Sequence, residues 1–174
     1  MELKFGTAGI RGIMGPEPGQ MNLETVRLAT RGVAGWLTGK KGAEHSTVPA
    51  VAEPVEAVEG TKKDLLVIIS RDSRNNSLAF AEETARTLEE CGIKALMFED
   101  IMPVPVLSFA VRYLHADAGV MITASHNAKE YNGYKLYGAT GGQILPEDAE
   151  VVQAEIKAIP ALRQAQEPQR KQQS

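Results

Sequence analysis

The sequence predicts an α/β fold: a three-layer α/β/α domain built on a mixed, mostly parallel sheet of four strands. Short apolar runs rich in β-branched residues alternate along the chain with longer stretches of helical periodicity. This alternation is typical of a sheet that helices cover on both faces. The strands are expected at residues 65–70, 94–98, 119–122 and 134–137. The last strand follows its predecessor closely, so it can run antiparallel to the others.

Helices are expected around these strands, over residues 22–38, 77–90, 106–114 and 146–159. Asn22 and Ser77 can each cap the helix that follows, because a side-chain oxygen accepts a hydrogen bond from a free amide of the first turn. Gly92 stands where the second helix ends, and Pro146 suits the first turn of the last one.

Two other stretches interrupt this pattern. Residues 46–60 consist mostly of Val, Ala, Glu and Pro without a helical stripe, and we interpret the surrounding segment, about 42–63, as a flexible insertion. Residues 160–174 are Gln-rich without an apolar face and are expected to form a disordered polar tail. The sequence therefore predicts one domain over residues 1–159.

Composition excludes several classes of protein. The chain has 174 residues, of which 43% are hydrophobic and 24% charged, as in an ordinary globular domain. Its net charge of −3 argues against nucleic-acid binding. Cys91 is the single cysteine, so neither an intrachain disulfide nor a cysteine-rich zinc site can form. No apolar run is long enough for a membrane span, and the first residues lack the layout of a signal peptide, so we expect a cytoplasmic protein without a membrane partner.

The segment after the third predicted strand carries the strongest candidate site. Ser125 lies three residues past the strand end, where ligands collect in open α/β sheets. A serine can accept and donate a phosphoryl group. His126 can transfer a proton, Lys135 can neutralise phosphate oxygens and Asn127 can orient them. On spacing alone a structural interpretation stays open, in which Ser125 and Asn127 form a turn and Lys135 lies on a sheet edge.

Two further segments can meet an anion. The glycine-rich residues 5–12 let backbone amides approach a phosphate, and Arg11 can grip it with two parallel hydrogen bonds, although the ending of a Walker A loop is missing. After the first strand, Arg71 and Arg74 can serve the same anion. Equally, the glycine-rich segment can be an entry loop with a surface arginine, and Asp72 can pair with Arg74 only to shape a turn.

Three motifs occur in one order along the chain: FGTAGIRG at 5–12, SRDSR at 70–74, and TASHN with EYNGYK within 123–135. Together they resemble the α-D-phosphohexomutase family, which includes phosphoglucomutases and phosphomannomutases. The resemblance covers about residues 2–159 apart from the insertion. It implies that the chain corresponds to domain I of a four-domain family, and the first motif is most similar to the phosphoglucomutase/phosphopentomutase branch.

The resemblance implies a phosphoserine mechanism. Family members interconvert a sugar 1-phosphate and a 6-phosphate: a phosphoserine donates its phosphoryl group, a bisphosphorylated sugar forms, and the other phosphate returns to the serine. The positions that match the family's catalytic residues are Ser125 (the phosphoserine), His126, Lys135 and Arg11, and those that match substrate- or phosphate-binding residues are Thr7, Asn127, Arg74 and Asn132. Mg²⁺ would contact the phosphate on Ser125, with its remaining ligands outside this chain, and a bisphosphorylated sugar would act as activator.

The chain departs from the family pattern in two ways. Ala128 stands where the family often has proline, which alters the stiffness of the loop. The metal-binding, sugar-reading and phosphate-gripping loops of domains II–IV are absent. We therefore expect a truncated chain that binds a phosphosugar, lacks mutase activity without its missing domains, and can self-associate through the face they would cover. The alternatives are a non-catalytic remnant that binds sugar phosphate or a protein partner, and a fragment of a phosphopentomutase or phosphoglucosamine mutase.

Overall fold

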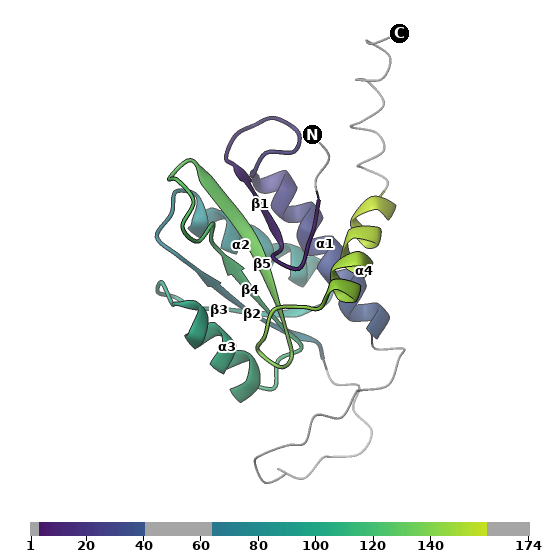
Figure 1. Ribbon diagram of the computed structural model, residues 1–174. Coiled ribbons are helices and arrows are strands. Elements are labelled where there is room, and N and C mark those ends of the chain that lie inside the picture. Colours follow the sequence, from purple (N-terminus) through teal and green to yellow (C-terminus); the bar gives the residue numbers. More distant parts are fainter. Residues whose placement is uncertain (1–3, 41–63, 160–174) are drawn as a thin grey trace, which may run out of the picture.

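The computed structural model describes residues 4–40 and 64–159 (Figure 1). Its elements are β1 (Ile10–Ile13), α1 (Leu23–Lys40), β2 (Leu66–Arg71), α2 (Ser77–Glu90), β3 (Lys94–Met97), α3 (Val104–Tyr113), β4 (Ala118–Ile122), β5 (Tyr131–Gly138) and α4 (Pro146–Ala158). The α/β alternation predicted from the sequence is confirmed. The predicted flexible insertion and polar tail lie outside the described residues.

The sheet has five strands rather than the four that the sequence predicts, in the order β1-β5-β4-β2-β3. Strand β2 runs parallel to β3 and β4, whereas β5 runs antiparallel to β4 and to β1. The mixed, partly antiparallel sheet is therefore confirmed. The additional strand, β1, lies in the glycine-rich segment, where Ile10 pairs with Tyr134 of a distant strand. The sequence around β1 has no apolar run that would predict this pairing, because the pairing depends on a strand more than a hundred residues away.

Local details of the helices follow from their first residues. The Asn22 side chain accepts a hydrogen bond from the Thr25 amide at 2.9 Å, which confirms the predicted cap of α1. The cap predicted for Ser77 is wrong: Asn76, in the left-handed region, precedes α2, and Ser77 is the first helical residue. Helix α3 begins two residues earlier than predicted, because Pro105 is tolerated in a first turn that needs no amide donor there.

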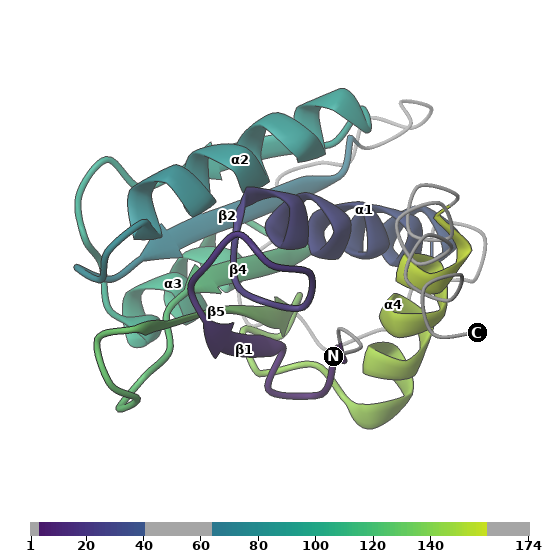
Figure 2. The same cartoon turned by 90° about the horizontal axis from the view of Figure 1, so that it is seen from above.

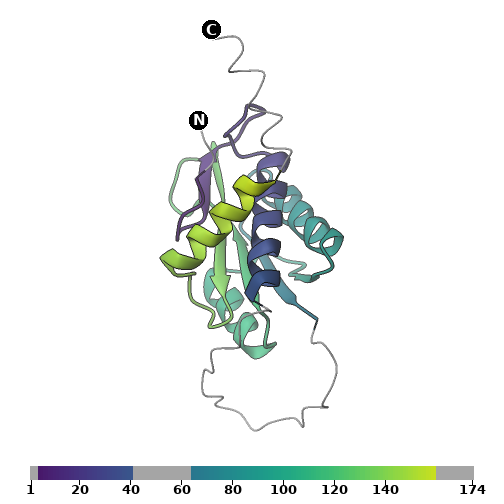
Figure 3. The same ribbon diagram turned by 90° about the vertical axis from the view of Figure 1, so that its right-hand side faces the viewer.

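Helices cover the two faces of the sheet unequally (Figures 2 and 3). Helices α1, α2 and α4 pack on one face, against a core that includes Val67, Ile69 and Val120. Helix α3 alone packs on the other face, over β2 and β4, against Ile68 and Met121. Alternate residues of each strand serve opposite faces, as the pleat requires. The three layers predicted from the sequence are therefore confirmed.

The face with α3 is only partly covered. Lys135 pairs with Met121 and Arg11 with Gly133, so the register turns Lys135 and Arg11 toward this same face. The strands that carry them, β5 and β1, lie to one side of β4 and β2, the strands over which α3 mainly packs. Two candidate site residues of the sheet therefore point to a region that α3 leaves open.

A tight turn fixes β1 against β5. Gly6 and Gly9 exchange backbone hydrogen bonds of 3.1 and 2.7 Å, and Phe5 packs edge-on against Tyr134 with 6.4 Å between ring centroids. Gly9 has φ +77°, and a Cβ there would lie 1.9 Å from the Tyr134 carbonyl oxygen. This position therefore requires glycine both for its backbone angle and for the close approach of β5.

We predict that Gly9→Ala lowers the free energy of unfolding by about 2–4 kcal/mol, because the methyl group combines a left-handed backbone with a clash against main chain. Gly39→Ala is the matched control: Gly39 lies in α1 with nothing within 4 Å of its Cβ position. It should gain about 0.5–1 kcal/mol from helix propensity. Urea unfolding of both variants measures the difference, and equal effects would contradict the assigned packing.

Candidate active site

Ser125 stands on the loop that joins β4 to β5, at the carboxyl edge of the parallel strands. Its side chain is exposed, and its backbone adopts φ +55°. The Ser125 amide donates to Thr123 Oγ at 2.9 Å, and the Thr123 amide donates to the Gly133 carbonyl at 3.0 Å. The loop is therefore anchored at the strand ends, and Ser125 holds an unusual conformation of the kind that collects at functional sites.

Lys135 reaches Ser125 from the neighbouring strand β5. Its ammonium Nζ donates to Ser125 Oγ at 2.5 Å. Burial lowers the pKa of Lys135 and the nearby Arg11 charge lowers it further, whereas Asp72 opposes the shift. Because this amine loses its proton more readily than an ordinary lysine, it can exchange a proton with the serine hydroxyl.

Arg11 completes a cationic cluster beside the serine. It extends from β1, is exposed, and its Nη1 donates to Asn127 Oδ1 at 2.8 Å. Ser125 therefore stands near two cationic side chains that come from two different strands. Such an arrangement favours an anion on the hydroxyl, because each charge-assisted donor stabilises phosphate oxygens.

Arg74 lies against the loop that carries Ser125. Its guanidinium hydrogen-bonds to main-chain carbonyls of the Ser125 loop, at distances of 2.6–3.1 Å. Its Nε also lies 3.3 Å from Asp72 Oδ2. The sequence alternative, in which Asp72 pairs with Arg74, is therefore present, but the pair does more than shape its own turn.

Asn132 is fully buried and lies behind the loop. Its Nδ2 donates to the Asn75 carbonyl at 2.9 Å and to Ser77 Oγ at 3.0 Å, and its Oδ1 accepts from the Gly133 amide at 2.7 Å. It joins the loop after β2 to the start of β5.

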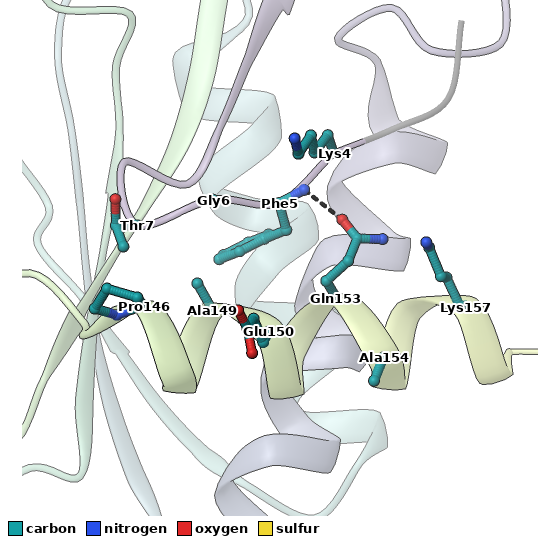
Figure 4. Close-up of a pocket in the computed structure, with 10 residues that line it drawn as sticks. All are labelled: Lys4, Phe5, Gly6, Thr7, Pro146, Ala149, Glu150, Gln153, Ala154 and Lys157. Atoms are coloured by element: carbon teal, nitrogen blue, oxygen red, sulfur yellow. Dashed lines mark hydrogen bonds between the residues drawn. The ribbon is translucent and has the colours of Figure 1, made fainter.

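Thr7 and His126 stand apart from the cluster. Thr7 lies at the tip of the turn between Gly6 and Gly9 and lines a cavity of about 410 Å³ between the N-terminal segment and α4 (Figure 4). In that cavity the Phe5 amide donates to Gln153 Oε1 at 2.5 Å. His126 is exposed beside Ser125. The structure thus brings Ser125, Lys135, Arg11 and Asn127 together. His126 is next to Ser125 in the chain, and Thr7 lies against α4.

Sequence reasoning missed the supporting roles of Asp72, Ser77 and Thr123. Ser77 Oγ donates to Asp72 Oδ1 at 2.8 Å, and the Arg74 amide donates to the same oxygen at 3.0 Å. The sequence feature that could have indicated a supporting role for Asp72 is its position directly after a strand, two residues before an arginine. Nothing in the sequence distinguishes Ser77 as a partner of that carboxylate from a simple helix cap.

The described residues do not fit a complete magnesium site. Over residues 4–40 and 64–159, no group of three or more His, Cys, Asp or Glu side chains gathers in a way that could hold a metal ion. Asp72, whose charge acts on Lys135, is engaged by Arg74 and Ser77. Because Mg²⁺ prefers six oxygen ligands, Ser125 alone cannot hold it.

In the part of the chain that the structure describes, no helix has both the length and the apolar composition to cross a membrane.

The fold and the site together define a class: an α/β/α domain that presents a serine, a lysine and an arginine at the carboxyl edge of its sheet. A family model described as phosphoglucomutase/phosphomannomutase, alpha/beta/alpha domain I, matches residues 45–163. The chain belongs to the phosphoglucomutase/phosphomannomutase family.

Similar proteins agree with this assignment. A phosphoglucomutase of Staphylococcus saprophyticus is 41% identical over 157 residues, covering 90% of this chain and 25% of that protein. A protein of Schizosaccharomyces pombe named a probable phosphoribomutase is 39% identical over 142 residues, covering 82% of this chain and 21% of its own. A solved structure from Thermus thermophilus, assigned as a phosphomannomutase, has a TM-score of 0.71 and 30% identity over 88% of this chain and 30% of its own. The chain thus spans about a quarter of the length of its curated relatives.

We predict that the pKa of Lys135 responds in opposite directions to its two charged neighbours. Arg11→Gln should raise the pKa, because it removes a repelling charge, and Asp72→Asn should lower it further, because it removes an attracting one. NMR titration of the Lys135 side chain measures both changes. Arg31→Gln, which removes a surface arginine paired with Glu90 at 3.7 Å, is the remote control. Shifts of the same sign in the two test variants would refute this electrostatic arrangement.

Proposed function

We propose that this domain carries the phosphoserine of a phosphohexomutase that interconverts a sugar 1-phosphate and a 6-phosphate through a bisphosphorylated sugar. The observation that carries the proposal is the 2.5 Å hydrogen bond from Lys135 Nζ to the exposed Ser125 Oγ. Phosphoryl transfer depends on positioning and charge neutralisation more than on covalent help from the protein. A hydroxyl on an exposed loop, held by a lysine with a lowered pKa, meets both needs.

When a bisphosphorylated sugar phosphorylates Ser125, the bond from phosphorus to a sugar oxygen breaks and a bond from phosphorus to Oγ forms. The hydroxyl proton passes from Oγ to Lys135 in its neutral amine form, and the sugar oxygen gains a proton from the site. His126 is exposed beside the reacting group and can supply that second proton. Arg11 stabilises the charge that spreads over the phosphoryl oxygens.

The other requirements of the reaction lie outside the described residues. We propose that a phosphate on Ser125 would supply one ligand to Mg²⁺ and a second domain the others; the ion would lower the cost of charge on that phosphate. We also propose that a bisphosphorylated sugar serves as activator in the cytoplasm, and that the chain alone lacks mutase turnover. The similarity to a probable phosphoribomutase favours a pentose phosphate as the second candidate substrate.

Phosphate uptake tests this function directly. Incubation with glucose 1,6-bisphosphate should add the mass of a single phosphate to the chain, and Ser125→Ala should abolish the addition. Ser73→Ala, at an exposed serine on the neighbouring loop, is the matched control and should keep it. Intact-mass spectrometry reads all three, and ribose 1,5-bisphosphate in parallel distinguishes the pentose alternative. Absence of phosphate with both sugars would favour a remnant that only binds ligands.

We further propose that another domain of a longer chain covers the face with α3. Phe109 and Tyr113 are 57% and 70% exposed and stack with ring centroids 5.4 Å apart, and Ile101 and Leu114 are also exposed. Exposed apolar area of this kind marks interaction surfaces. Because the chain spans about a quarter of its relatives' length, we expect the partner of this face to be another domain of a longer protein.

Without such a domain, the same face should cause weak self-association. Light scattering over a concentration series should show a rising mass, because burying the exposed rings in a second copy removes them from water. Phe109→Ser with Tyr113→Ser should reduce that rise, whereas Leu78→Ser, an exposed leucine on α2, should leave it. A monomer at every concentration would contradict this assignment of the face.

A further inference from the structure

The guanidinium of Arg74 is surrounded by main-chain oxygens of the loop that carries Ser125. Nη2 donates to the carbonyls of Ser125 and Asn127 at 2.7 and 2.6 Å, and Nη1 donates to those of Ala128 and Tyr131 at 2.9 and 3.1 Å. The side chain is only 15% exposed. One planar, charged group therefore gathers four carbonyls that lie within seven consecutive residues.

The guanidinium is itself held from behind by Asp72. Arg74 Nε lies 3.3 Å from Asp72 Oδ2, so each of its three nitrogens faces an acceptor. Asp72 Oδ1 accepts from Ser77 Oγ at 2.8 Å, and Ser77 Oγ in turn accepts from Asn132 Nδ2 at 3.0 Å. The loop after β2, the first residue of α2 and the start of β5 thus form one hydrogen-bonded support.

The four bonds also decide which way the loop amides point. In a trans peptide the carbonyl and the following amide point in opposite directions, so the amides of His126, Ala128 and Lys129 point away from Arg74. Within the described part of the chain these three amides donate to no protein acceptor. The carbonyl edge of the loop is therefore satisfied by Arg74, and its amide edge is left for another acceptor.

We propose that Arg74 is the positioning residue of the phosphoserine loop: by gathering four carbonyls of residues 125–131, it holds Ser125 Oγ beside Lys135 and leaves the opposite amide edge to an anion. Arg74 acts from the side of the loop away from the amide edge and touches no substrate. Its catalytic consequence rests on the proposed function, whereas its ordering of the loop does not.

A lysine cannot replace this arginine. Its ammonium is a compact point charge with three donors and cannot face four carbonyls and a carboxylate in one plane. In Arg74→Lys the positive charge stays, but the loop loses the planar guanidinium that defines its shape. The amides of Asn127 and Tyr131, which are bonded within the loop at 3.1 and 3.0 Å, should then exchange with solvent at least about tenfold faster.

The rate of Ser125 phosphorylation distinguishes a positioning role of Arg74 from a role in substrate binding. Misplacing the reacting oxygen by about an ångström can cost on the order of a hundredfold in rate. Arg74→Lys should therefore slow phosphorylation of Ser125 by glucose 1,6-bisphosphate about ten- to a hundredfold. The sugar concentration that gives half the maximal rate should change much less, because Arg74 does not contact the sugar.

The experiment compares wild type, Arg74→Lys, Asp72→Asn and the control Arg31→Lys, a surface arginine of α1 paired with Glu90. Hydrogen exchange of the loop and of β4 is measured first, followed by phosphorylation rates. Faster exchange confined to the loop, with slower phosphorylation, supports the inference. Asp72→Asn keeps the guanidinium but removes the carboxylate that holds it, and should show the same pattern more weakly. This variant keeps the test decisive if Arg74→Lys fails to fold.

The outcomes distinguish the two proposals. Loop exchange that is unchanged in both Arg74→Lys and Asp72→Asn would overturn the positioning role, whatever the phosphorylation rates. A wild-type chain that takes no phosphate, combined with faster loop exchange in the variants, would overturn the proposed function and leave the positioning role supported. A fall in apparent sugar affinity without a fall in maximal rate would overturn positioning in favour of direct binding.

Discussion

The candidate site depends on the register of the β4–β5 hairpin. Met121 lies opposite Lys135, and the Thr123 amide bonds to the Gly133 carbonyl just past the end of β4. These pairings bring a lysine ten residues along the chain back to the serine of the loop. A slip of one residue would turn Lys135 to the opposite, helix-packed face of the sheet and leave the Ser125 hydroxyl without its cation. The register is protected because both strands bury most of their residues.

Unequal coverage of the sheet explains how charged groups can be both fixed and accessible. The face with α1, α2 and α4 is closed by a core cluster, and the short helix α3 covers only part of the other face. Arg11 and Lys135 extend from strands on the uncovered part, so their backbones have the rigidity of a sheet while their side chains meet solvent. Sites on strands are held more precisely than sites on loops. The loop residues of the cluster, Ser125 and Asn127, need separate support, and Arg74 provides it.

The sequence predicts the layers well, because they leave local signals. Apolar β-branched runs mark the central strands, and Ser125 stands three residues past the end of one of them. Strand β1 is not predictable in this way: its pairing with β5 depends on Gly9, which permits close approach of main chain, rather than on an apolar run. The contacts of Arg74 leave even less trace, since its partners are carbonyl oxygens that every residue has. A basic residue at a strand end predicts an anion or an acidic partner, and main-chain acceptors can be identified only from coordinates.

Electrostatics ties the protonation of Lys135 to the state of Ser125. With the hydroxyl free, burial and Arg11 lower the pKa of Lys135, which increases the share of neutral amine that is available to accept the serine proton. A phosphate on Ser125 would place a doubly charged anion beside the same amine and raise its pKa, because an adjacent opposite charge favours the protonated form. The lysine would then hold a proton while the phosphoryl group is stored and be ready to return it to Oγ when that group leaves. Under the proposed function, a single cation of this kind would serve both directions of phosphoryl transfer.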